Sequence, residues 1–100
     1  MESKFSGMFG MAVHAGKVIY GNYSVKAALM KGRVSLVVIG SGISDRSRKD
    51  AVNMCEYYKT DYIEPDIPGL IENISGKKEV YVVGITDPNM AKQLKKIITA

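Results

Sequence analysis

Leu36-Val37-Val38-Ile39-Gly40 is an unbroken apolar run that ends at a glycine. A strand with one face in water alternates apolar and polar residues, whereas a strand that is covered on both faces is apolar throughout. The run therefore predicts a buried central strand.

The residues that follow this strand predict a helix and a second, shorter strand. Ser44 can cap a helix start through its side-chain oxygen. Apolar residues then recur at the spacing of one helix face, at Ala51, Met54, Cys55 and Tyr58. Tyr62-Ile63 follows as a short strand.

Two more helices and another buried strand are predicted further along the chain. Asp66 and Pro68 favour a helix start, and Gly76 follows the end of that helix. Val80–Ile85 is a second buried strand. Asp87-Pro88 combines a capping residue with a proline at the first helical position, which predicts a last helix. Its inner stripe consists of Met90, Leu94, Ile97 and Ile98.

The residues before the central strand show the same alternation of helix and strand. A first helix is predicted from one apolar stripe, which consists of Phe5, Met8, Phe9, Ala12 and Val13. Gly16 is suited to its C-terminal cap. Val18–Tyr20 is a short strand, and Gly21-Asn22 supplies a turn and an N-cap for a helix that ends before Gly32.

This alternation defines the expected fold class, which is α/β. We predict one domain, residues 1–100, built as a three-layer α/β/α sandwich around a mixed sheet of about four strands. The strand order does not follow from the sequence pattern.

Composition narrows the function classes. Hydrophobic residues make up 46% and charged residues 24% of the chain, as in ordinary globular proteins. No apolar run is long enough to span a membrane, so we expect a cytoplasmic protein with no membrane partner.

The net charge is +4, while residues 59–76 hold one lysine against four carboxylates. That segment carries −3 and the remainder +7, which favours a polyanionic partner.

Candidates for catalysis and cofactor binding are few. His14, the single histidine, stands beside no recognisable nucleophile, and Cys55 lies on an inward helix face, where a thiol packs as a small hydrophobe. No Cys or His spacing matches a metal site. Gly40-Ser41-Gly42-Ile43-Ser44-Asp45 joins a strand to a helix, but Asp45 stands where a dinucleotide fingerprint has glycine or alanine. We expect no enzyme activity, no metal and no cofactor.

The segment from Lys17 to Lys26 gathers groups that suit RNA. Amides at a helix start carry partial positive charge, and Lys17 and Lys26 add full charges beside them. Asn22 and Ser24 can hydrogen-bond to a base edge or a phosphate, and Tyr23 offers a ring on which an unstacked base can lie. An ordinary capped helix with solvated lysines would show the same residues.

The order and spacing of several short sequence segments along residues 5–98 resemble those of the ribosomal L7Ae/L30e family, and of its small bacterial branch in particular. The resemblance rests on segments that share their order with the family: Ala15-Gly16-Lys17-Val18, Gly21, Lys31-Gly32, Leu36-Val37-Val38-Ile39, Cys55-Glu56-Tyr57-Tyr58-Lys59, Gly76-Lys77-Lys78-Glu79-Val80 and Ile85-Thr86-Asp87. It implies the same sandwich fold, binding of kink-turn or related structured RNA, and a ribosomal or ribonucleoprotein setting.

The resemblance also implies two RNA-contacting regions. The first is Gly21, Asn22, Tyr23 and Ser24 with the helix turn after them, and the second is the loop Gly76, Lys77 and Lys78. The chain departs from the family pattern at Tyr23, Ser24 and Ala27, where the family has a polar pair and a lysine. Lys26 is one residue out of register, which turns its side chain by about 100° on a helix.

The leading hypothesis is therefore non-catalytic binding of structured RNA, such as ribosomal RNA, by a monomer that has no DNA partner. The expected contacts are Lys17, Gly21, Asn22, Tyr23, Ser24, Lys26, Gly76, Lys77 and Lys78. Two alternatives stay open. One is a protein-interaction scaffold that keeps the fold without the RNA site. The other is a small-ligand or nucleotide binder that uses Gly40–Ser44.

Overall fold

The computed structural model describes residues 2–99 and the side chains of residues 3–99. Helices and strands alternate along this range, as the sequence predicts. In chain order they are α1 (Glu2–His14), β1 (Val18–Tyr20), α2 (Asn22–Met30), β2 (Leu36–Ile39), α3 (Asp45–Tyr57), β3 (Tyr62–Ile63), α4 (Leu70–Ser75), β4 (Val82–Ile85) and α5 (Pro88–Thr99).

The strands form one mixed sheet in the order β1-β4-β2-β3. β4 pairs antiparallel with both β1 and β2, and β2 pairs parallel with β3. The predicted central position of residues 36–39 is confirmed, because β2 has a neighbour on each side and all four of its residues are buried.

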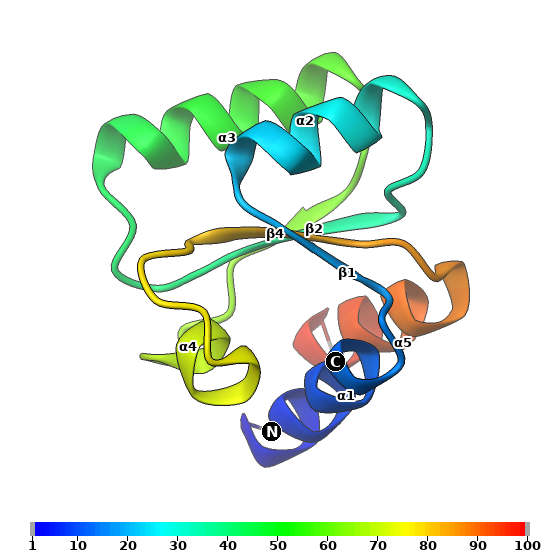
Figure 1. Ribbon diagram of the computed structural model, residues 1–100, viewed down its shortest axis with the longest axis vertical. Helices are drawn as coiled ribbons and strands as arrows, with labels where there is room; N and C mark the ends of the chain where they lie inside the picture. The colour runs from blue at the N-terminus through cyan, green and yellow to red at the C-terminus, as the bar shows by residue number, and fades with distance from the viewer. Residues whose placement is uncertain (1, 100) are drawn as a thin grey trace.

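Helices cover both faces of the sheet, which confirms the predicted sandwich. Figure 1 shows α2 and α3 on one face and α1, α4 and α5 on the other. Alternate residues of β2 point to opposite layers. Leu36 and Val38 pack in the core with Phe5 of α1, whereas Val37 and Ile39 pack in the core beneath α2 and α3.

Three residues that the sequence predicts as helix caps have that role in the structure. The Ser47 amide donates to Ser44 Oγ at 3.2 Å at the start of α3. Asp87 Oδ1 accepts hydrogen bonds from the amides of Asn89 and Met90 at 2.9 and 3.1 Å at the start of α5. Gly16 follows α1 with a φ of 70°, as its predicted capping role requires.

Three predicted boundaries are wrong. Asn22 is the first residue of α2 rather than its cap; Gly21 is the cap, at φ 90° and ψ 151°, a conformation open essentially to glycine alone. The helix expected from Asp66 begins at Leu70, because Gly69 in the left-handed conformation separates α4 from the preceding turn. The strand expected from Val80 begins at Val82, because the chain turns at Glu79, where φ is 58°.

One edge of the sheet gathers three chain segments. β1 and β2 run in the same direction, since each is antiparallel to β4, so both end where β4 begins. Two backbone hydrogen bonds close this edge. The Gly21 amide donates to the Val82 carbonyl at 2.8 Å, and the Gly40 amide donates to the Tyr81 carbonyl at 2.7 Å. The start of α2, the loop before α3 and the loop before β4 therefore meet here.

Candidate functional site

The start of α2 exposes backbone amides. Gly21 has no side chain, and no described residue caps this helix with a side-chain hydrogen bond, in contrast to α3 and α5. Asn22, Tyr23 and Ser24, the first turn of the helix, are all exposed. The first amides of a helix lack acceptors within the helix, and the helix dipole adds positive potential. This turn can therefore hold an anion such as a phosphate.

The loop after α4 is held against the end of β1. Ser75 Oγ donates to the Ile71 carbonyl at 2.5 Å and accepts the Lys77 amide at 3.1 Å. Lys77 Nζ lies 5.5 Å from the centre of the Tyr20 ring, within the range of a cation–π contact. Because Tyr20 directly precedes Gly21, this contact brings the lysine loop beside the start of α2.

Tyr20 has a positioning role that the sequence analysis missed. Partial burial raises the pKa of Tyr20, and a side-chain hydrogen bond with Ser75 offsets part of the rise. Its phenol is therefore neutral at physiological pH, and its ring supports the lysine loop through the contact with Lys77. The available signal was an aromatic residue at the end of a strand, immediately before the glycine of the helix start.

A hollow of about 420 Å³ lies where the three segments meet. It is bounded by the start of α2, the start of α3 and the loop before β4, and its lining residues are Gly21, Asn22, Gly42, Ile43, Ser44, Ser47, Glu79, Val80, Tyr81 and Val82. Glu79 and Tyr81 were not among the residues predicted from the sequence, because neither shows its position until the sheet has formed. A carboxylate can accept hydrogen bonds from base amino groups, and an exposed ring can contact a base.

A second hollow, the α2–α3 groove, begins at the same place. Its volume is about 810 Å³, and its lining residues are Asn22, Tyr23, Lys26, Asp50, Asn53, Met54, Tyr57 and Tyr58. Asn22 lines both hollows, so they adjoin at the start of α2. The one-residue shift of Lys26 thus has a structural consequence: this lysine lies on the groove, together with Tyr23.

Most of the expected contact residues gather at this edge, but Lys17 does not. Gly76, Lys77 and Lys78 are exposed in the loop beside Tyr20, and Ser24 is exposed on the first turn of α2. Lys17 precedes β1 and lies at the opposite edge of the sheet, where its carbonyl accepts hydrogen bonds from the Thr86 amide and hydroxyl. The length of β1 separates it from Gly21, roughly 13 Å for four extended residues.

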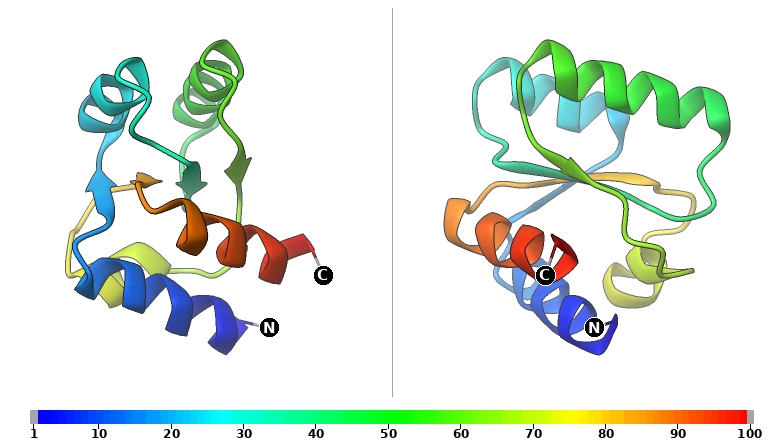
Figure 2. Two further views of the ribbon diagram at one scale, coloured as in Figure 1. Left: turned by 90° about the vertical axis from the view of Figure 1, so that its right-hand side faces the viewer. Right: turned by 180° about the vertical axis from the view of Figure 1, so that it is seen from behind.

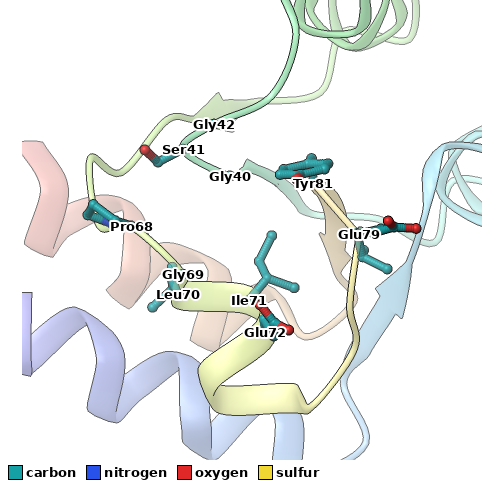
Figure 3. Close-up of a pocket in the computed structure, with 11 residues that line it drawn as sticks. Gly40, Ser41, Gly42, Pro68, Gly69, Leu70, Ile71, Glu72, Glu79 and Tyr81 are labelled. Carbon is teal, nitrogen blue, oxygen red and sulfur yellow. The ribbon is translucent and has the colours of Figure 1, made fainter.

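The loop that suggested nucleotide binding, residues 40–44, also borders a third pocket, shown in Figure 3. This pocket has a volume of about 330 Å³ and includes Gly40, Ser41 and Gly42 in its lining. Glu72 and Glu79 also line it, and no basic side chain of residues 3–99 does. Ser44 Oγ already accepts one amide at the start of α3. Two carboxylates in the lining of the pocket oppose a phosphate there, and the Ser47 amide at the start of α3 already has an acceptor. These features do not favour the nucleotide alternative.

The candidate catalytic residues lie outside these hollows. His14 is exposed in the last turn of α1. Cys55 is completely buried, and this burial raises the pKa of its thiol to about 11, so the thiol carries a proton at neutral pH. Within the described part of the chain, no three His, Cys, Asp or Glu side chains are grouped so that they could hold a metal ion. Nor is any helix of residues 2–99 long and apolar enough to cross a membrane.

Two relatives align with nearly the whole chain. A protein of Bacillus subtilis (strain 168), named RNA-binding protein YlxQ, is 28% identical over 91 residues, which are 91% of each chain. A protein of the same name from Enterococcus faecium is 27% identical over 97 residues, covering 97% of this chain and 93% of its own. The sequence matches no family model. Membership of the L7Ae/L30e family therefore stays a prediction.

A solved structure supports the fold independently. A protein of unknown function from Bacillus halodurans C superposes with a TM-score of 0.89, covering 97% of this chain and 98% of its own. Its sequence identity is 24%. The similarity therefore concerns the fold, and the candidate interface rests on the residues of this chain.

Proposed function

We propose that this protein binds structured RNA and catalyses no reaction, with the kink-turn as the RNA shape it recognises. The observation that carries the proposal is the contact of the lysine loop, residues 76–78, with Tyr20, the residue directly before the open helix start at Gly21. Both relatives that align with nearly the whole chain are named RNA-binding proteins, which supports the same class of partner.

The two sides of this edge have complementary roles toward RNA. Open amides at the start of α2 suit a phosphate, and Lys77 and Lys78 add positive charge beside them. Asn22 and Glu79, which line the hollow at the start of α2, provide a donor–acceptor amide and a carboxylate that can read base edges. Phosphate contacts position the RNA and base contacts select it. A bent RNA presents both its backbone and unpaired bases to such an edge.

Departures from the L7Ae pattern concern the choice of bases rather than the phosphate contacts. Tyr23, Ser24 and Ala27 replace the polar pair and the lysine of that pattern, and Lys26 lies on the groove. Glu79 lies on the hollow beside Asn22 and provides a carboxylate from another segment. We propose that selection of a kink-turn by this chain depends on Glu79 and Asn22. A ribosomal or other ribonucleoprotein setting belongs to the same proposal.

The test compares a kink-turn RNA with a plain duplex of equal length across a salt series. We expect a preference of more than about tenfold for the kink-turn, equivalent to about 1.4 kcal/mol. Lys77→Ala should weaken binding and reduce the slope of log affinity against log salt by about 0.9, because one phosphate contact is removed. Glu79→Gln should reduce the preference between the two RNAs.

Lys92→Ala is the matched control. Lys92 is exposed on α5, which follows the end of β4, whereas the lysine loop precedes the start of β4 at the opposite edge of the sheet. Its removal should therefore leave both the affinity and the salt slope unchanged. Equal binding of kink-turn and duplex would reject the kink-turn and leave another RNA shape. Binding of neither RNA would favour the protein-interaction scaffold. Equal effects of Lys77→Ala and Lys92→Ala would remove the lysine loop from the interface.

A further inference from the structure

We infer that the α2–α3 groove is a second binding site, which holds unpaired nucleobases of an RNA strand that continues past the start of α2. The inference rests on the proposed RNA binding and extends it to another surface. Its starting point is that the two hollows adjoin, because Asn22 lines both the groove and the hollow at the start of α2. A strand that leaves the hollow at Asn22 enters the groove directly.

The groove offers aromatic surface without an aliphatic face. Its apolar lining residues are three tyrosines and Met54, and no Leu, Ile, Val or Phe of residues 3–99 lines it. Tyr23 is 89% exposed and Tyr57 is 78% exposed, one from each helix. A groove for an amphipathic helix would present aliphatic side chains to that helix, whereas exposed aromatic rings suit stacking with bases. The lining therefore favours a nucleobase over a protein helix.

The Tyr57 ring packs on a neighbouring ring. It meets the Tyr58 ring edge-to-face, with the centres 4.9 Å apart and the planes at 84°. Tyr58 is half-buried and packs against the core beneath α2 and α3. A ring that is already oriented loses little conformational freedom when a base stacks on it.

The polar side chains of the groove suit the edges of nucleobases rather than the phosphate backbone. Asn22 and Asn53 each provide an amide with donors and an acceptor, as base recognition requires. Lys26 and Asp50 give the lining one positive and one negative charge, so it is not a general anion site. Arg46 lies one helical turn before Asp50 on the same face of α3, where it can meet the phosphate beside a bound base.

Figure 2 shows that α2 and α3 lie together on one face of the sheet, opposite α1 and α5. This arrangement separates the groove from the exposed residues of α1. Met11 on α1 is 58% exposed and belongs to the other layer, so it provides a matched control for the loss of an exposed apolar side chain.

The experiment measures the affinity of the full chain for blunt RNAs and for RNAs with an unpaired extension of eight adenosines. The kink-turn and the plain duplex are each prepared blunt, with a 5′ extension and with a 3′ extension. A further set carries abasic extensions, which keep the phosphates and remove the bases. We expect one of the adenosine extensions to raise the affinity by on the order of 5-fold or more, as one stacked base provides, and the abasic extension to give no such gain.

Variants locate this gain in the groove. Tyr57→Ala should abolish it while leaving the affinity for blunt RNA unchanged, Tyr57→Phe should retain it, and Asn53→Ala should reduce it. Met11→Ala should have no effect. Equal affinity for blunt and extended RNAs, an equal gain from abasic extensions, or a full gain in Tyr57→Ala would overturn the inference.

The comparison also separates this inference from the proposed function. A blunt kink-turn that binds no better than a blunt duplex rejects the kink-turn proposal, while the gain from the extension still tests the groove on either RNA. The same affinity for the adenosine extension with and without a saturating amphipathic peptide helix that needs Tyr57 for its own binding would reject the nucleobase assignment. Absence of any RNA binding would reject both proposals together.

Discussion

Replacing Gly21 with alanine tests whether the start of α2 has the backbone conformation on which the interface depends. At φ 90° and ψ 151° this residue occupies a region that is essentially restricted to glycine. An added Cβ would meet no heavy atom within 4 Å, so the substitution introduces no collision. Its cost is backbone strain, for which we expect a loss of about 1–3 kcal/mol in the free energy of unfolding.

Gly7→Ala is the matched control for this substitution. Gly7 lies in α1, and a Cβ there also meets no atom within 4 Å, but its backbone is helical. Alanine should therefore raise the free energy of unfolding by about 0.5–1 kcal/mol, because it loses less backbone freedom than glycine on folding. The two variants should thus change stability in opposite directions.

Urea unfolding followed by far-UV circular dichroism measures both effects, and RNA titration measures the functional consequence. In thermal unfolding, each kcal/mol of change in the free energy of unfolding corresponds to about 4–8 °C in Tm for a domain of this size. Gly21→Ala should also weaken binding of a kink-turn RNA, since the strained turn displaces the first amides of α2. A neutral or stabilising Gly21→Ala would refute the assigned backbone conformation, and with it the open amides as the anion site.

Three further predictions concern the core and a cap. Asp87→Ala should lower the free energy of unfolding by about 1 kcal/mol, because two amides of α5 lose their acceptor. Urea unfolding measures this loss, and Gln93→Ala, at an exposed position of the same helix, is the control. Gly84→Ala should cost about 1–3 kcal/mol, since its Cβ would lie 3.2 Å from both γ-carbons of Val34, and Val34→Ala should relieve part of this loss. Cys55 should make stability fall between pH 9 and about 11, because burial raises its pKa from 9.0 to about 11 and the unfolded thiol loses its proton first. Unfolding at pH 8 and pH 10 should therefore show a smaller decrease for Cys55→Ala than for the wild type.

Local chemistry explains why much of the fold is readable from the sequence. Ser44 and Asp87 cap the next helix through atoms two or three residues away, so their role needs no tertiary contact. The continuous apolar run at residues 36–39 requires cover on both faces wherever the strand lies in the sheet. Boundaries at Gly69 and Glu79 were missed because a positive φ there is one of several conformations compatible with the local sequence.

The candidate site was predictable in its parts and not in its assembly. Asn22, Tyr23 and the lysine loop were recognisable as residue types, yet the same reasoning included Lys17, which the sheet places at its opposite edge. Tyr20 and Glu79 were missed because each acquires its position from a segment about 60 residues away in the chain. Side-chain chemistry alone does not determine such neighbours.

The sequence by itself determined the alternation of helix and strand, the buried strands and the capped helix starts, because these follow from side-chain periodicity and hydrogen bonds between near neighbours. Only the tertiary structure decided the strand order β1-β4-β2-β3 and the edge where α2, α3 and the loop before β4 meet. The physical reason is that many pairings of short apolar strands satisfy the same pattern. The packing of two helical layers on one sheet selects among them, and that selection brings Lys77 onto Tyr20, the residue before the start of α2.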